Sequence, residues 1–316
     1  MTVLPGLGAV LLTAVLLGVL WYRLRVIGRC GLALAAVLSV VTTAVAQVND
    51  MVQAYPTGGA AQPVAATGSQ MLAVTVPGRF TMPMYVYLPA AYRTAVRTRF
   101  PVIEALHGYP GSPQTWLRRL HVQSTLDREI AAGRMAPTVV LFPYQTPKHL
   151  LDTECTNLRG GPQAETFLTV DVPAFARAHY RVRADRAAWG LTGYSAGAFC
   201  ALNLSLRHPG EYAAAAGMSG YASPGITIGD GSEKTSNNPG WRLRHLPQPS
   251  LALWLGWAAD DKESARDSRR LCRLAHAPLS VTTAVVAHGG HSDAAWNEME
   301  PPSFDWLAAH LARPLP

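Results

Sequence analysis

Short apolar runs alternate with helical patterns along most of this 316-residue chain. The apolar runs typical of buried strands are residues 71–76, 84–88, 100–106, 138–142, 187–192, 213–218, 251–257 and 280–286. Helical patterns occupy residues 114–132, 171–179, 195–207, 263–274 and 294–311. Buried strands that alternate with crossover helices are typical of a mainly parallel sheet covered on both faces. The sequence therefore predicts an α/β fold with about eight strands and helices on both faces of the sheet.

The first fifty residues have a different character. Residues 3–22 are an apolar run long enough to cross a hydrocarbon core, and a second apolar stretch covers residues 30–46. The connector between them carries three arginines, and no acidic residue occurs before Asp50. Because positively charged loops stay on the cytoplasmic side, residues 1–46 are predicted to form a transmembrane helical hairpin. The rest of the chain would then lie outside the cytoplasm, attached to the cell membrane.

Signal-peptide cleavage is the alternative, because the small-x-small sequence that ends at Ala46 is one that a signal peptidase cuts. The chain after Ala46 would then be secreted, and both interpretations export it. Residues 47–70 are rich in Ala, Gly, Thr, Pro and Gln without a period, which indicates a linker. Residues 71–316 are left as the globular domain.

The formal net charge of +7 comes without a cluster of basic residues interleaved with aromatics. The charge is diffuse, so no nucleic acid partner is expected. The sequence also lacks His-Glu-x-x-His, Cys-x-x-Cys and a Gly-rich Walker loop. No metal and no cofactor are therefore expected.

A glycine-flanked serine follows the expected strand at 187–192. Residues 193–197 read GYSAG and lead into a helical pattern, with Ser195 at the centre. This strand-turn-helix context is that of a nucleophile elbow, in which glycines keep side chains out of a tight turn. Ser195 is the candidate nucleophile.

A serine nucleophile needs a histidine as its base and a carboxylate that orients the histidine. In chains with a nucleophile elbow these residues follow one another in the order serine, acid, histidine. The expected strand at 251–257 is followed closely by Asp260 and Asp261. Asp261 is the candidate acid and Asp260 the alternative. The other member of the pair is expected to be a surface carboxylate or a helix N-cap, because a helical pattern begins directly after it.

The histidine should follow the last strand. His288 and His291 both come after the expected strand at 280–286, and His291 lies in a loop before the final helix. His291 is the candidate base. His288, closer to the strand end, is expected to have a supporting or solvent-facing role.

Two backbone N–H groups are needed to hold the oxyanion. One is expected from Ala196, the residue after the nucleophile, and the other from the loop that follows the strand at 100–106. In that loop Tyr109 is the candidate donor, because Pro110 has no N–H. His107 is expected to organise the loop rather than act as a base.

These motifs together resemble the esterase family that includes esterase D, feruloyl esterases and the antigen 85-type mycolyltransferases, and most closely its membrane-anchored actinobacterial members. The resemblance runs from about residue 71 to residue 311. The segments that carry it are VYLP (86–89), LHGYPGS (106–112), DTEC (152–155), the Ser195 elbow, ALNLSLRHP (201–209) and GGH (289–291). It implies an α/β-hydrolase fold, carboxylic ester hydrolysis or acyl transfer, a triad of Ser195, Asp261 and His291, and Tyr109 and Ala196 as oxyanion donors.

Three cysteines follow the anchor, which allows one disulfide in an oxidising compartment and leaves one unpaired. The sequence alone does not choose among Cys155, Cys200 and Cys272. Cys155 lies in a loop before the elbow and Cys200 in the helix after it, so a bridge between these two, bracing the site, is a hypothesis. Cys30 is expected to be a small apolar residue within the anchor.

The residues thus favour a serine esterase that works through an acyl-enzyme. With water as acceptor it hydrolyses an acyl ester, whereas a sugar or lipid hydroxyl would make it an envelope acyltransferase. A hypothesis of another class is a non-catalytic envelope binding module. The irregular segment 229–249 is either a cover over the site or a passive surface segment. The acyl chain length and the oligomeric state stay open.

Overall fold

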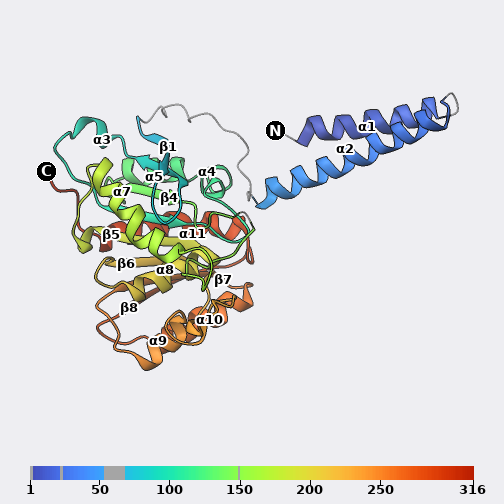
Figure 1. The fold of residues 1–316 in the computed structure, drawn as a ribbon. Helices are drawn as coiled ribbons and strands as arrows, with labels where there is room; N and C mark the ends of the chain where they lie inside the picture. Colours follow the sequence, from blue (N-terminus) through green and yellow to red (C-terminus); the bar gives the residue numbers. More distant parts are fainter. Residues whose placement is uncertain (1–2, 22–23, 53–67, 149) are drawn as a thin grey trace. The chain divides into compact units, whose positions relative to one another are not determined.

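The computed structural model describes residues 3–21, 24–52, 68–148 and 150–316. They belong to two compact units, Met1–Tyr55 and Pro56–Pro316 (Figure 1). The first unit holds two helices, α1 (Val3–Leu20) and α2 (Val26–Val52), which lie side by side as a hairpin.

Helix α2 is longer than the sequence predicted, because it starts at Val26 and continues to Val52 instead of covering 30–46. Nothing between residues 47 and 52 interrupts a helix, and the first proline after them is Pro56. Its residues Val26–Asn49 have the length and the mean hydropathy, 2.0, of a membrane span, and none of this stretch is buried. Residues 53–67, most of the predicted linker, lie outside the described residues.

The second unit is built on an eight-stranded sheet in the order β1-β2-β4-β3-β5-β6-β7-β8. Strand β2 is antiparallel to both β1 and β4, and all other neighbours are parallel. The strands are β1 (Gln70–Val76), β2 (Met82–Leu88), β3 (Val102–Leu106), β4 (Val139–Pro143), β5 (Trp189–Tyr194), β6 (Ala214–Met218), β7 (Ala252–Ala258) and β8 (Ser280–Val286). All eight predicted strands are confirmed, with ends that differ by at most two residues.

Helices cover both faces of the sheet, as predicted (Figure 1). They are α3 (Ala91–Thr94), α4 (Gln114–Arg118), α5 (Val122–Ala131), α6 (Ala164–Thr166), α7 (Val172–His179), α8 (Ala196–Arg207), α9 (Pro239–His245), α10 (Lys262–Leu274) and α11 (Asp293–His310). The single helix expected at 114–132 was wrong. It is divided into α4 and α5 because His121 takes a left-handed conformation, with φ 53°, that an α-helix does not contain.

Two apolar cores lie on the two faces of the sheet. One contains side chains of α7, α8, α9 and α10, and the other contains side chains of α4, α5 and α11. Strand β7 shows the alternation, because Leu255 and Trp257 belong to the first core and Trp254 to the second. Burial on both faces explains why the strands read as nearly continuous apolar runs in the sequence.

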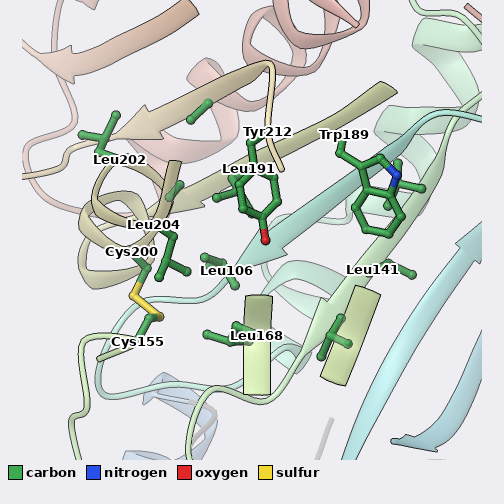
Figure 2. Packing of buried hydrophobic residues seen from close by; sticks show 14 of the residues in the cluster. Leu106, Leu141, Cys155, Leu168, Trp189, Leu191, Cys200, Leu202, Leu204 and Tyr212 are labelled. Atoms are coloured by element: carbon green, nitrogen blue, oxygen red, sulfur yellow. A yellow bond between two sulfur atoms is a disulfide. The ribbon is translucent and has the colours of Figure 1, made fainter. Parts of the chain in front are cut away.

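A disulfide closes the edge of the first core. Cys155, in the loop before α6, is bonded to Cys200 in α8, with their Cα atoms 5.5 Å apart (Figure 2). The hypothesis from the sequence is confirmed, and Cys272 is a free thiol. The bridge fixes the loop 152–155 against the helix that starts directly after Ser195.

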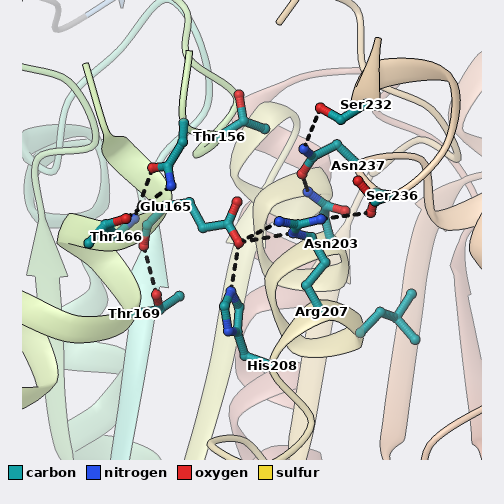
Figure 3. Close-up of polar contacts among 12 residues, drawn as sticks. Thr156, Glu165, Thr166, Thr169, Asn203, Arg207, His208, Ser232, Ser236 and Asn237 are labelled. Carbon is teal, nitrogen blue, oxygen red and sulfur yellow. Dashed lines mark hydrogen bonds and ion pairs between the residues drawn. The ribbon is translucent and has the colours of Figure 1, made fainter. Parts of the chain in front are cut away.

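The segment 229–249, irregular in sequence, is held by polar contacts and includes α9 (Figure 3). The Asn203 side chain on α8 donates to Asn237 at 3.0 Å. Arg207, also on α8, forms an ion pair with Glu165 at 2.9 Å and donates to the carbonyl of Ser236. The bonds to Asn237 and Ser236 attach the segment to α8.

Candidate active site

Ser195 occupies the sharp turn between β5 and α8. Its φ of 55° and ψ of −123° are rare for a residue with a side chain, and its N–H donates to the Met218 carbonyl at 2.9 Å. A Cβ at Gly193 would lie 2.2 Å from the backbone of Gly197, and one at Gly197 would lie 2.2 Å from the Leu106 oxygen. Both glycines are therefore required by the close packing of the turn.

A chain of hydrogen bonds connects Ser195 to two residues far along the sequence. The Ser195 hydroxyl and His291 Nε2 are 2.8 Å apart, and His291 Nδ1 and Asp261 Oδ2 are also 2.8 Å apart. An ionised carboxylate only accepts, so Nδ1 carries the proton and Nε2 is left to accept from the serine. The imidazole is nearly perpendicular to the Trp296 ring, with ring centroids 5.3 Å apart, and this contact limits the orientation of the imidazole.

Asp261 has a second partner at the start of α10. Its Oδ1 accepts from the Ser264 N–H at 3.2 Å, so this residue is also the N-cap of the helix. Burial raises the pKa of Asp261, but the hydrogen bonds from His291 and Ser264 outweigh burial and bring it below its usual value. The carboxylate is therefore charged at neutral pH.

Asp260, the alternative acid, contacts a different group. Its Oδ1 accepts from the Gly290 N–H at 2.9 Å and its Oδ2 from the Gly289 N–H at 3.3 Å. These bonds hold the loop that carries His291. From the sequence, one aspartate is expected to be the catalytic acid and the other a surface or N-cap residue. In the structure Asp261 both contacts His291 and caps α10, and Asp260 holds the loop that carries His291.

Two other histidines had been weighed as alternatives. His288 is exposed, at the beginning of the same loop. His107 is buried, and its Nδ1 donates to the Gly108 carbonyl at 2.9 Å. Burial lowers the pKa of His107 to about 4, so the imidazole is neutral. Among the described residues, the histidine that hydrogen-bonds to the Ser195 hydroxyl is His291 and neither of these two.

The two expected oxyanion donors lie near each other. Tyr109 and Ala196 both line a small cavity of about 10 Å³. Ala196 is the first residue of α8, where N–H groups lack a partner within the helix. The Tyr109 hydroxyl donates to the Leu150 carbonyl at 2.8 Å, and Gln145 donates to the His107 carbonyl at 3.1 Å. Two hydrogen bonds to neighbouring loops therefore hold the loop that carries Tyr109. The role of the Tyr109 and Ala196 N–H groups as oxyanion donors stays a prediction.

A larger cavity of about 430 Å³ opens beside His291. Besides Asp261 and His291, its walls include residues to which sequence reasoning gave no role, among them Glu154 and Tyr221. Glu154 Oε1 accepts from the Tyr221 hydroxyl at 2.6 Å and from the Gly225 N–H at 3.0 Å. The one signal in the sequence was the position of Glu154 next to Cys155. In the described part of the chain, no group of three or more His, Cys, Asp or Glu side chains is arranged to hold a metal ion.

Comparisons with known proteins agree with this architecture. The esterase family model matches residues 77–311. An uncharacterized protein of Corynebacterium glutamicum is 26% identical over 323 residues, which cover 88% of this chain and 75% of the relative.

Solved structures give the same fold. A ferulic acid esterase superposes with a TM-score of 0.67 at 20% identity, covering 78% of this chain and 100% of that one. The Staphylococcus aureus fluorophosphonate-binding serine hydrolase FphF gives a TM-score of 0.61 at 14% identity, covering 76% and 98%. At such identities the likeness shows a shared α/β-hydrolase fold and leaves the substrate undefined. Because the family match extends over well more than half of the chain, this protein belongs to the esterase family.

Proposed function

We propose that this protein is a serine carboxylic ester hydrolase that acts outside the cytoplasm, with Ser195, His291 and Asp261 as its catalytic triad. The observation that carries the proposal is the hydrogen-bonded chain from the Ser195 hydroxyl through His291 to Asp261, with both distances at 2.8 Å. Membership of the esterase family supports the reaction class.

The first half of the reaction forms an acyl-enzyme. His291 Nε2 takes the hydroxyl proton while Ser195 Oγ attacks the ester carbonyl, and Asp261 stabilises the imidazolium. The N–H groups of Ala196 and Tyr109 bind the oxyanion, and each such donor contributes about 10²–10³ in rate. The tetrahedral intermediate collapses when His291 returns the proton to the leaving alcohol oxygen.

The second half repeats these steps with water. His291 removes a proton from the water as its oxygen attacks the acyl carbon, and the serine oxygen leaves with that proton. The acid product and the free enzyme result.

Hydrolysis of a p-nitrophenyl acyl series tests the proposal and ranks the acyl lengths. We expect Ser195→Ala to abolish turnover. Ser124→Ala, on α5, should leave it unchanged, because the exposed Ser124 hydroxyl donates to the nearby His121 carbonyl. Equal turnover by wild type and Ser195→Ala would reject Ser195 as the nucleophile.

Acyl transfer is a second candidate, favoured by the 430 Å³ cavity beside His291, which has room for an acceptor alcohol. An acceptor there would replace water in the second half-reaction. Transfer product in excess of free acid, when a sugar or lipid alcohol is added, would put this candidate first.

The N-terminal helices are proposed to anchor the enzyme, with residues 1–46 as the anchor, 47–70 as linker and 71–316 as the catalytic domain. The apolar, exposed stretch Val26–Asn49 supports a membrane location, and the Cys155–Cys200 disulfide supports an oxidising compartment. Protease treatment of intact spheroplasts should remove the domain. Protection from the protease would place it in the cytoplasm, and a soluble product that begins at residue 47 would instead identify a cleaved signal peptide.

A further inference from the structure

The cavity beside His291 has an acidic wall. Its lining includes the carboxylates of Glu154, Asp261, Glu263 and Asp267, against the single guanidinium of Arg266. This local charge is opposite to the formal net charge of the chain, +7. Such a cavity favours cationic ligands and disfavours anionic ones.

Of these four carboxylates, two already have hydrogen-bond partners in the protein and a third is exposed to water. Asp261 is bonded to His291, and Asp267 accepts from Arg266 and from the Ala222 N–H, both at 3.0 Å. The Glu263 side chain is 81% exposed, so water weakens its attraction for a cation in the cavity.

Glu154 differs from these three because it is 3% exposed and no Lys or Arg in the described part of the chain pairs with it. Its Oε1 accepts from the Tyr221 hydroxyl and the Gly225 N–H, its Oε2 shares the Gly225 N–H at 3.0 Å, and the Ile226 N–H is a further backbone donor to the carboxylate. All of these donors are neutral, so they satisfy hydrogen-bonding positions of the carboxylate without supplying an opposite charge. The neighbouring Cys155–Cys200 bridge holds the backbone of this loop.

The leaving alcohol belongs on this side of the site. His291 returns its proton to the leaving oxygen, so the alcohol part of the ester lies beside the imidazole. The 430 Å³ cavity is lined by His291 and Glu154, and Glu154 also lines the small cavity to which Tyr109 and Ala196 contribute.

We propose that Glu154 makes the leaving-group side of the site selective for alcohols that carry a positive charge, such as amino alcohols. The inference rests on the proposed esterase activity of Ser195. A cation in the cavity supplies the buried carboxylate with the opposite charge that it lacks. An opposite charge within ~4–6 Å typically shifts an equilibrium by tenfold or more, so we expect a preference of about tenfold over a neutral alcohol of the same shape.

The ionisation of Glu154 provides a second readout. Burial raises the pKa of Glu154 to about 7, although hydrogen bonds from Tyr221 and Gly225 lower it. The carboxylate is therefore mostly neutral at pH 6 and mostly charged at pH 8. The ionisable groups that share the loop or line the cavity are Asp152, Tyr221, Asp261, Glu263, Arg266, Asp267 and His291.

The test compares two esters with the full chain in detergent. Acetylcholine and 3,3-dimethylbutyl acetate have the same shape and acyl group, and differ in the charge of the leaving alcohol. The ratio of their kcat/KM values cancels the ionisation of His291, which affects both. We expect the ratio to be about ten at pH 8 and to fall toward one at pH 6, since one pKa unit corresponds to a tenfold change.

Glu154→Gln isolates the charge, because the amide oxygen can still accept from Tyr221 and Gly225. We expect this variant to give a ratio near one at every pH. Glu298→Gln is the matched control, because it removes one exposed carboxylate on α11 that does not line the cavity, and it should keep the wild-type ratio. A wild-type ratio that is near one, or that does not change between pH 6 and pH 8, overturns the proposal even if Glu154→Gln does not fold.

A labelling experiment removes the dependence on the acyl group. Choline should protect Ser195 from a fluorophosphonate better than 3,3-dimethylbutanol does, by about the same tenfold factor. Labelling of Ser195 with equal protection by both alcohols rejects the charge selectivity and leaves the serine hydrolase proposal standing. If Ser195 of the folded chain neither reacts nor hydrolyses any ester, the proposed function fails, and this inference fails with it.

Discussion

Glu104 provides a test of how burial sets charge in this fold. It lies in β3, paired with Leu141 on one side and Leu191 on the other, and these two leucines are labelled in Figure 2. Its side chain is fully buried, and neither carboxyl oxygen has a hydrogen-bond partner among the described residues. Burial raises the pKa of Glu104 well above the ordinary value of 4.5, so the group is protonated in the folded protein.

The magnitude follows from linkage between protonation and folding. The unfolded chain releases the Glu104 proton above pH 4.5, while the folded chain retains it. The contribution of the raised pKa to stability is complete below that pH and is lost as pH rises. The loss is about 1.4 kcal/mol for each pH unit over which the folded chain retains the proton and the unfolded chain does not.

Glu104→Gln keeps the shape of the side chain, and the amide cannot ionise. The free energy of unfolding of this variant therefore lacks the pH dependence that Glu104 causes. We expect the free energy of unfolding of the variant, minus that of wild type, to increase with pH above 4.5, by about 1.4 kcal/mol per pH unit while the folded chain retains the proton. Urea unfolding of the full chain in detergent, followed by near-ultraviolet circular dichroism, measures this difference. Glu298→Gln serves as the exposed control, with a difference independent of pH. If the Glu104→Gln difference is also constant with pH, burial does not keep the carboxyl protonated and the reasoning is refuted.

Three further predictions concern the site and its supports. Gly197→Ala should cost about 2 kcal/mol of stability and most of the activity, because the new Cβ would lie 2.2 Å from a backbone oxygen; a stable, active variant in urea unfolding and ester hydrolysis would contradict this packing. Asp261→Asn should lower kcat by about 10⁴, because an amide no longer fixes the histidine tautomer, whereas Asp260→Asn should cost only about tenfold through a looser loop. Steady-state kinetics of the two variants would contradict the assignment of the acid if their order were reversed. Cys200→Ala removes a bridge between residues 45 positions apart and should lower the free energy of unfolding by about 4 kcal/mol. If a reducing agent did not lower the free energy of unfolding of the wild type, this would contradict a formed disulfide.

Much of the fold could be predicted because it depends on local patterns. Strands buried on both faces give continuous apolar runs, and all eight were located from the sequence. The turn at Ser195 was also local, because a serine between glycines after a strand has few other structures. The break at His121 could not be predicted, since a left-handed residue there leaves no pattern in the sequence.

Contacts between distant segments were harder to predict. The sequence left two aspartates open, and only the folded chain separates them, with Asp261 against His291 and Asp260 against the glycines before it. The environment of Glu154 was not predictable either, because it depends on Tyr221 and Gly225 from another loop. Burial of a carboxylate is a property of tertiary packing and has no signal in composition or periodicity.

The central claim is that Ser195 is the nucleophile, and mass-spectrometric mapping of a fluorophosphonate adduct tests it most directly. The account predicts one adduct, on the peptide that contains Ser195, with labelling abolished by Ser195→Ala and strongly slowed by His291→Gln. An adduct on another residue, or undiminished labelling of a folded Ser195→Ala variant, would contradict it.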